Sequence, residues 1–322
     1  MDDGQSSKSV KPRAVFSRRA LLESARRAVP GLALAGALVA VVTLVAGGAA
    51  GSAEKGPSLS AARESLSRDR LYPVPFDPGE TLVYTIAWLK IEGGEMTLRT
   101  ARETTSDGVP VHRMTLVATS NDYVSKFYPV RDLYETWVDA RDFQPLRFEK
   151  HAREGRYESD EVEEFDLARR IGSWREDRTP LPERVQDIIS SFYFLRAQPL
   201  AIGQDVRVDM FSRGKVYKLK AAVLTKEKVE TEAGVFDAFK VQPQLRENET
   251  DEDRNRGKLF LWFSDDARRL PVMARTLMPI GSVTARLRKI TAGTKPPGPA
   301  AAPGTSGGMA ARHEPPGASL NR

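Results

Sequence analysis

Two histidines are the clearest candidates for metal or acid–base chemistry in this chain. His112 falls within one predicted strand and His151 at the end of another, and no His-x-x-x-His pair occurs. The chain contains no cysteine, so a metal site would need carboxylates from elsewhere to converge on these two imidazoles. We therefore expect surface or partly buried imidazoles, with no metal and no cofactor.

Two short polar pairs, one of carboxylates and one of hydroxyls, could also do chemistry. Asp265-Asp266 could act as acid and base or bind a cation, but the pair precedes Arg268-Arg269, as expected of a turn that Asp caps. Ser190-Ser191 lies near Asp187 without a Gly-x-Ser-x-Gly elbow or a paired histidine, so we expect helix packing. Phosphate-binding glycine loops are absent. We name no catalytic residue and expect a protein that is not an enzyme.

An acidic group occupies a third position, inside the predicted strand 157–166. It consists of Glu161, Glu163 and Glu164. Because carboxylates are rarely buried without a partner, we expect this group to solvate a strand edge.

Aromatic and arginine side chains form the most suggestive set for binding. We expect them to be either plain core or the lining of an apolar groove for an acyl chain. The candidate ligand-binding residues are Trp88, Arg131, Tyr193, Arg196 and Trp262. Arg131 and Arg196 could meet an anionic head group, or could instead pair with Asp132 and Asp187.

The elements that would position these residues are mainly strands. Apolar side chains alternate over short segments, which turn residues separate at short intervals. The predicted strands are 81–88, 96–100, 111–118, 133–138, 146–151, 157–166, 206–211, 215–224, 236–243, 258–263, 271–278 and 281–290. Gly93-Gly94 and Asp107-Gly108 predict hairpin turns. Apolar residues at helical spacing predict one amphipathic helix over 182–196.

Charge and composition divide the chain into five zones. These are a basic leader (1–27), an uncharged apolar segment (28–53), a polar linker (54–71), a single β-rich domain (72–290) and a Pro/Gly/Ala tail (291–322) that we expect to be disordered. The leader carries +4 and the tail +2 of the formal net charge of +6, which leaves residues 28–290 with a net charge of zero. A nucleic-acid binder would carry its positive charge on the folded domain, so we expect no nucleic-acid partner.

The apolar segment 28–53 predicts where the protein acts. Its length lies between that of a secretory signal and that of a spanning helix, and the preceding arginines suit either. Ser17-Arg18-Arg19-Ala20-Leu21-Leu22 is similar to a twin-arginine export motif, so general secretion and twin-arginine export both stay open. We expect a periplasmic protein, either secreted or tethered to the inner membrane by residues 28–53.

Four stretches of the predicted domain resemble a bacterial envelope family called domain of unknown function 3108. They are residues 76–95, 127–132, 187–196 and 262–271, and the likeness extends over about residues 72–290. The resemblance implies an exported, mainly β protein without an established activity. We expect a curled antiparallel sheet or open barrel with one amphipathic helix packed on it, preceded by a signal or transmembrane helix.

Three functions are compatible with these observations. The first is a non-enzymatic envelope protein that binds an amphiphile, such as a lipid or glycolipid, in an apolar groove. The second is a structural or adaptor protein that binds other envelope proteins. The third is a hydrolase with an unrecognised site. A continuous apolar cavity would favour the first function, and a filled core with an exposed apolar patch would favour the second. A cleft in which histidines and carboxylates converge would favour the third.

Overall fold

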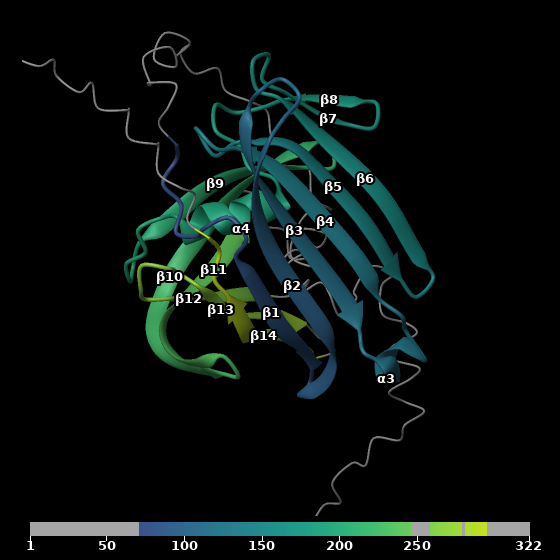
Figure 1. The fold of residues 1–322 in the computed structure, drawn as a ribbon, viewed down its shortest axis with the longest axis vertical. Helices are drawn as coiled ribbons and strands as arrows, with labels where there is room; N and C mark the ends of the chain where they lie inside the picture. The colour runs from purple at the N-terminus through teal and green to yellow at the C-terminus, as the bar shows by residue number, and fades with distance from the viewer. Residues whose placement is uncertain (1–70, 246–257, 279–280, 295–322) are drawn as a thin grey trace, which may run out of the picture.

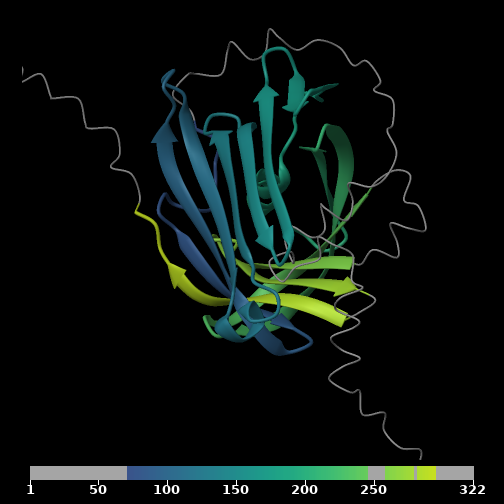
Figure 2. The ribbon, with the colours of Figure 1, turned by 90° about the vertical axis from the view of Figure 1, so that its right-hand side faces the viewer.

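A computed structural model of the chain describes residues 71–245, 258–278 and 281–294. They form one antiparallel sheet of 14 strands, in the order β8-β7-β6-β5-β4-β3-β2-β1-β14-β13-β12-β11-β10-β9. The sheet curls around helix α4, and its edge strands β8 and β9 are not paired with each other (Figures 1 and 2). The predicted mainly β, curled fold is therefore confirmed, as a sheet that does not close.

The strands agree closely with the alternation in the sequence. They are β1 (Thr81–Trp88), β2 (Ile91–Thr104), β3 (Pro110–Ser120), β4 (Arg131–Asp139), β5 (Pro145–Glu154), β6 (Tyr157–Asp166), β7 (Ile171–Trp174), β8 (Asp177–Pro180), β9 (Asp205–Ser212), β10 (Lys215–Thr231), β11 (Gly234–Leu245), β12 (Lys258–Ser264), β13 (Pro271–Met278) and β14 (Gly281–Thr291). The sequence did not predict β7 and β8, which are only four residues long. It also did not predict the short helix α3 (Asp122–Ser125).

The first hairpin turn lies at Leu89 and Lys90, and the prediction that Gly93-Gly94 forms it is wrong. Trp88 pairs with Ile91, which leaves a two-residue loop in which both residues have positive φ, 48° and 75°. Gly94 instead lies inside β2, opposite Ser120 of β3. A Cβ atom on Gly94 would stand 2.2 Å from the carbonyl oxygen of Thr119, so glycine is required there by close backbone approach.

Helix α4 spans Ile188–Arg196 and is shorter than the helix predicted over 182–196. Asp187 ends the extended segment before it, because its carboxylate accepts the backbone N–H groups of Ile189 and Ser190. Gln186 makes strand-like backbone hydrogen bonds to Asp209 and Phe211 of β9. The residues before α4 thus extend the edge of the sheet, which competes with helix formation.

The core fills the space between α4 and the concave face of the sheet. Phe192 of α4 contacts the Phe263 ring, and Tyr193 contacts the Phe76 ring, with centroids 5.6 Å and 5.2 Å apart. Leu82, Tyr84 and Ile86 of β1 alternate inward and are buried. The alternation predicted for 81–88 is therefore present, although Trp88 at its end is only half-buried.

The leader, the apolar segment 28–53 and nearly all of the linker and tail lie outside the described residues. Within the described ranges, no helix is both long and apolar enough to cross a membrane.

Candidate functional site

Two of the five candidate binding residues belong to the packed interior. Tyr193 and Arg196 of α4 are 1 % exposed. Arg196 pairs with Glu80, Nη1 to Oε1 at 2.5 Å and Nη2 to Oε2 at 2.8 Å, and not with Asp187. Its guanidinium also donates to the carbonyl oxygens of Arg268 and Pro75. These contacts occupy the guanidinium as a tie between α4, the start of the domain and the β12–β13 turn.

Trp262 lies on β12, away from α4, and is 2 % exposed. Its indole N–H donates to a carboxylate oxygen of Glu227 at 2.6 Å. The ammonium group of Lys240 lies 5.3 Å from its ring centroid. Trp262 is thus held by side chains of β10 and β11, and the structure does not bring it together with Tyr193 and Arg196.

Trp88 and Arg131 lie at one end of the sheet, beside the turns there. Trp88 is half-buried at the end of β1, and Arg131 is exposed at the start of β4. Asp132, the partner considered for Arg131, alternates to the inner face and accepts the backbone N–H of Arg153 at 2.9 Å.

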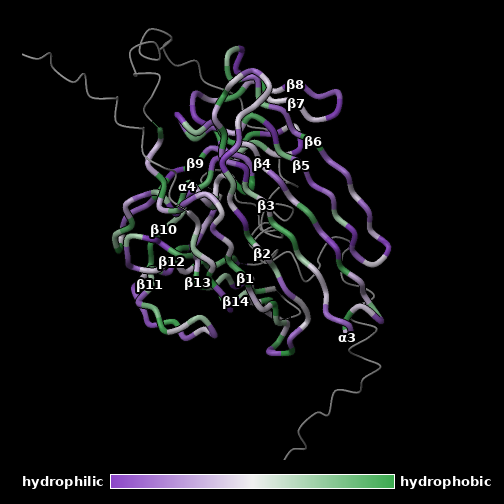
Figure 3. Tube along the Cα trace, viewed as in Figure 1, coloured by the Kyte–Doolittle hydropathy of each residue, from purple (hydrophilic) through white to green (hydrophobic). Residues whose placement is uncertain are grey.

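Large apolar side chains are exposed on three adjoining segments at this end. The segments are the β1–β2 turn, the α3 loop and the end of β13 (Figure 1), and Figure 3 shows apolar residues in the first two. We call this surface the apolar end and define it by Leu89, Ile91, Tyr123, Phe127 and Leu277, which are 47, 60, 63, 64 and 41 % exposed.

Hydrogen bonds hold the three segments of the apolar end beside one another. Asn121, which caps α3, donates its backbone N–H to Gly93 and its side-chain amide to Glu92. Leu89 donates its backbone N–H to Ser282 of β14, and Ser282 pairs with Leu277. Tyr123 and Phe127 contact each other through their rings, with centroids 5.9 Å apart.

A second group of ionisable side chains lines the inner face of β4, β5 and β6. Glu161 and Glu163 are buried there, so the expectation that this acidic group solvates a strand edge is wrong for both. Only Glu164, one residue out of phase, points outward and pairs with Arg147 at 2.8 Å. Arg213 of the β9–β10 turn contacts Glu161 at 2.9 Å and donates its backbone N–H to Glu163 at 2.7 Å. These contacts hold the two ends of the open sheet together.

Burial changes the acidity of these inward carboxyl groups. It raises the pKa of Glu163 to about 8, and the charge of Asp187 acts in the same direction. Burial and the neighbouring Asp132 raise the pKa of Glu154 to about 8. Burial also raises the pKa of Asp132, so that pair holds a proton at neutral pH. Hydrogen bonds from Arg213 and Ser159 lower the pKa of Glu161, although burial opposes them.

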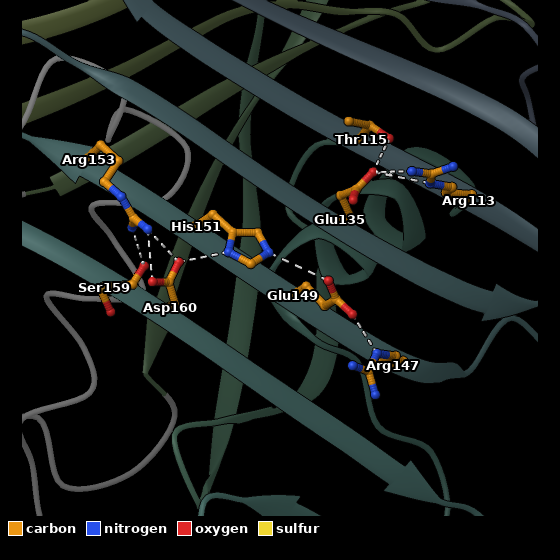
Figure 4. A network of polar contacts seen from close by, with 9 residues as sticks. All are labelled: Arg113, Thr115, Glu135, Arg147, Glu149, His151, Arg153, Ser159 and Asp160. Carbon is orange, nitrogen blue, oxygen red and sulfur yellow. Dashed lines mark hydrogen bonds and ion pairs between the residues drawn. The ribbon is translucent and has the colours of Figure 1, made fainter.

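The two histidines lie on opposite faces of the sheet and do not converge. His112 is buried between the rings of Phe76 and Phe143, where burial and the charge of Arg102 lower its pKa to about 4. His151 faces outward in a row of ion pairs across β3 to β6, hydrogen-bonded to Asp160 at 2.8 Å (Figure 4). Among the described residues, no group of three or more His, Asp or Glu side chains is placed to hold a metal ion.

The two polar pairs singled out in the sequence have structural roles. Ser190 is fully buried in α4, and its hydroxyl also accepts the backbone N–H of Asp187, which completes a helix cap that the sequence did not predict. Asp266 accepts the backbone N–H groups of Arg268 and Arg269 and forms an ion pair with Arg268 at 2.7 Å, as predicted for a turn.

Sequence periodicity could locate the strands under these sites but not the sites themselves. The alternation of β6 does not predict that Arg213, from a distant turn, forms an ion pair with Glu161 and so compensates for its burial. The apolar end carries a weak signal, because Leu89 and Ile91 flank a lysine where a turn would ordinarily be polar.

Comparison with solved structures finds distant likenesses. A Brucella abortus protein, described as a β-barrel-like protein of the domain of unknown function DUF1849, is 12% identical, with 68% of this chain and 99% of that chain covered and a TM-score of 0.47. For a hypothetical protein of Chlamydia trachomatis the identity is 8%, the coverages 69% and 92%, and the TM-score 0.31. A Bacteroides fragilis protein, inferred to be exported and described as having a YmcC-like fold, is 12% identical. The match covers 69% of this chain and 99% of that chain, with a TM-score of 0.27. Identities this low say nothing about function.

No curated protein matches the chain. The profile of one protein family does match it, over residues 83–288, which run from β1 to β14. The chain therefore belongs to the family of proteins of unknown function DUF3108, as its four matching stretches predicted.

Proposed function

We propose that this protein is an exported, non-enzymatic component of the cell envelope that binds an amphiphile through its apolar end. The observation that carries the proposal is the gathering of five large, exposed apolar side chains on adjoining segments. Contiguous apolar patches on soluble domains mark contacts with other molecules more often than isolated apolar residues do.

The proposed location rests on the sequence. Residues 28–53 carry no charge and follow a basic leader, which is the arrangement of export signals and membrane anchors. A lipid or glycolipid of the envelope is then the most abundant amphiphile that the domain would meet.

Two further observations favour the surface of the molecule over its interior. The aromatic side chains expected to line a groove pack against one another around α4, as the contacts of Phe192 and Tyr193 show. The polar pairs that could have served catalysis are engaged in capping α4 and the β12–β13 turn. We therefore place the amphiphile at the apolar end.

Native mass spectrometry of the full chain, gently extracted from its own envelope, tests the proposal. The variants Ile91→Asp and Ile202→Asp form a matched pair, because both isoleucines are 60 % exposed and Ile202 lies in the turn before β9. We expect Ile91→Asp to lose co-purifying lipid that the wild type and Ile202→Asp retain. Equal lipid in all three would refute binding at the apolar end. Loss of a co-purifying protein instead of lipid would favour the adaptor function.

A further inference from the structure

We infer that the amphiphile met by the apolar end is the surface of an anionic lipid bilayer, an inference that rests on the proposed function. Peripheral proteins enter the interface between head groups and acyl chains with aliphatic and aromatic side chains on protruding segments. The apolar end has this form, because Leu89 lies in the tip of one hairpin with Ile91 directly after it, and Tyr123 and Phe127 lie on the loop beside it.

Charge around the apolar end is complementary to lipid phosphates. Among the described residues on and beside its segments, exposed cationic side chains outnumber exposed carboxylates: Lys90, Lys126, Arg131, Arg156 and Lys258, against Glu92, Asp122 and Glu158. Lys90 lies in the turn between Leu89 and Ile91, and Lys126 directly precedes Phe127. Lysine side chains beside inserted apolar groups can extend toward the head groups while their stems stay in apolar surroundings. A protein partner would not require this alternation of cationic and apolar side chains.

The backbone of the β1–β2 turn indicates that its side chains were retained for a function other than folding. A two-residue hairpin loop with positive φ at both positions favours Asn-Gly or Asp-Gly, because other side chains are strained there. Leu89 and Lys90 occupy these positions, with φ of 48° and 75°. Leu89 is 47 % exposed at this strained position, with part of its side chain near Gly281, so its exposed part is available for a contact outside the domain.

Residues 54–70 of the linker are long enough for the apolar end to contact a bilayer that holds residues 28–53. Tyr72 donates its backbone N–H to Ala140, just past β4, whereas the α3 loop precedes β4, so the chain enters the domain at the end opposite the apolar end. Strand β4 has 9 residues and is about 30 Å long. Residues 54–70 could extend to roughly 60 Å. The apolar end can therefore reach a bilayer in which residues 28–53 are held.

The absence of cysteine gives a direct test in the full chain. Single variants Ile91→Cys and Ile202→Cys can each carry one environment-sensitive fluorophore, with the protein reconstituted into vesicles that contain nitroxide-labelled lipid. In vesicles containing phosphatidylglycerol, we expect quenching at position 91 to exceed that at position 202 at least threefold, an order-of-magnitude expectation for an inserted probe. Equal quenching at the two positions would overturn the inference.

Comparing anionic with uncharged vesicles distinguishes a failure of this inference from a failure of the proposed function. In vesicles of phosphatidylcholine alone, quenching at position 91 is expected to fall to that at position 202. Adding Lys90→Glu and Lys126→Glu should reduce the ratio of docked to undocked protein at least about tenfold in anionic vesicles. If quenching at 91 is the same with both lipids, the anionic bilayer is refuted while amphiphile binding stands. If, without lipid, the probe at position 91 becomes less exposed to water as the protein concentration rises, the apolar end binds a second copy of the chain, and the inference fails.

Discussion

Arg196 and Glu80 form a bidentate ion pair in the core, with the guanidinium of Arg196 fully buried. The pair joins helix α4 to the residue before β1, and the aromatic rings of Phe76 and Tyr193 lie against the guanidinium. Four charge-assisted hydrogen bonds to Glu80 and to backbone carbonyls, formed by Nη1 and Nη2, compensate for the loss of hydration. The interaction fixes α4 inside the curl of the sheet.

Removing one partner of this pair should destabilise the domain strongly. We expect Glu80→Gln to reduce the free energy of unfolding by about 3–5 kcal/mol, because it leaves the guanidinium charge buried without a counter-charge. The double variant Arg196→Met, Glu80→Met removes both charges and should be less destabilised than Glu80→Gln. Urea unfolding of the wild type, Glu80→Gln, the single variants Arg196→Met and Glu80→Met, and the double variant measures these differences. A double variant as unstable as the sum of both single variants would show that the ion pair itself is not the coupled unit.

Buried His112 should make the domain sensitive to acid. Its pKa is lowered to about 4 in the fold, while the unfolded chain binds a proton near 6.5, so the unfolded state carries more protons between these values. The free energy of unfolding should therefore rise with pH over this window. His112→Gln should remove that part of the dependence, measured by urea unfolding at several pH values. The same slope in wild type and variant would place the acid sensitivity elsewhere.

Glu163 should have the opposite effect at higher pH. Its pKa is raised to about 8 in the fold, so the folded state holds a proton that the unfolded chain has lost above about 4.5. Stability should then fall as pH rises from 4.5 to 8, by up to roughly 1.4 kcal/mol per pH unit. Glu163→Gln should flatten this decline and be more stable than the wild type at pH 9. Glu164→Gln, on the outer face, is the control and should leave the slope unchanged.

Alternation of apolar residues in the sequence was sufficient to predict most of the strands, because in a strand with one face in the core every second side chain is buried. Tyr157–Asp166 and Pro271–Met278 match their predicted ranges. The short strands β7 and β8 escaped prediction because four residues are too few to show a period. Helix α4 was overestimated because Val185 and Ile188 share helical spacing although Asp187 already caps the helix between them.

The sites depended on contacts that no local pattern encodes. For Arg196 the sequence left open an anionic head group or Asp187, but its partner is Glu80, which lies 116 residues away in sequence. The sequence predicted that Glu161 and Glu163 face solvent. In the fold, Arg213 from another turn donates a guanidinium N–H to Glu161 and its backbone N–H to Glu163. Long-range pairing of this kind follows from the fold and could not be found from spacing.

Gly94 should be intolerant of substitution because of where its backbone lies. A Cβ atom would stand 2.2 Å from the carbonyl oxygen of Thr119 and 3.1 Å from the Cα of Ser120, and these are backbone atoms that cannot rotate away. Gly94→Ala should reduce the free energy of unfolding by about 3 kcal/mol. Gly108→Ala is the control, with open space around its Cβ and a φ of 79°, and should reduce it by about 1–2 kcal/mol. Equal losses in urea unfolding would show that close approach of β3 is not what requires glycine.

Replacing the β1–β2 turn should improve stability while it removes part of the apolar end. The double variant Leu89→Asn, Lys90→Gly places favoured residues at the two positions with positive φ and should raise the free energy of unfolding by about 1 kcal/mol. A higher urea midpoint at unchanged slope would measure this. A lower midpoint would mean that Leu89 stabilises the domain by packing near Gly281, which its side chain approaches. Since the same variant deletes a side chain that we place on the bilayer, stability and membrane contact should change in opposite directions, as expected where a local folding preference has been given up for binding.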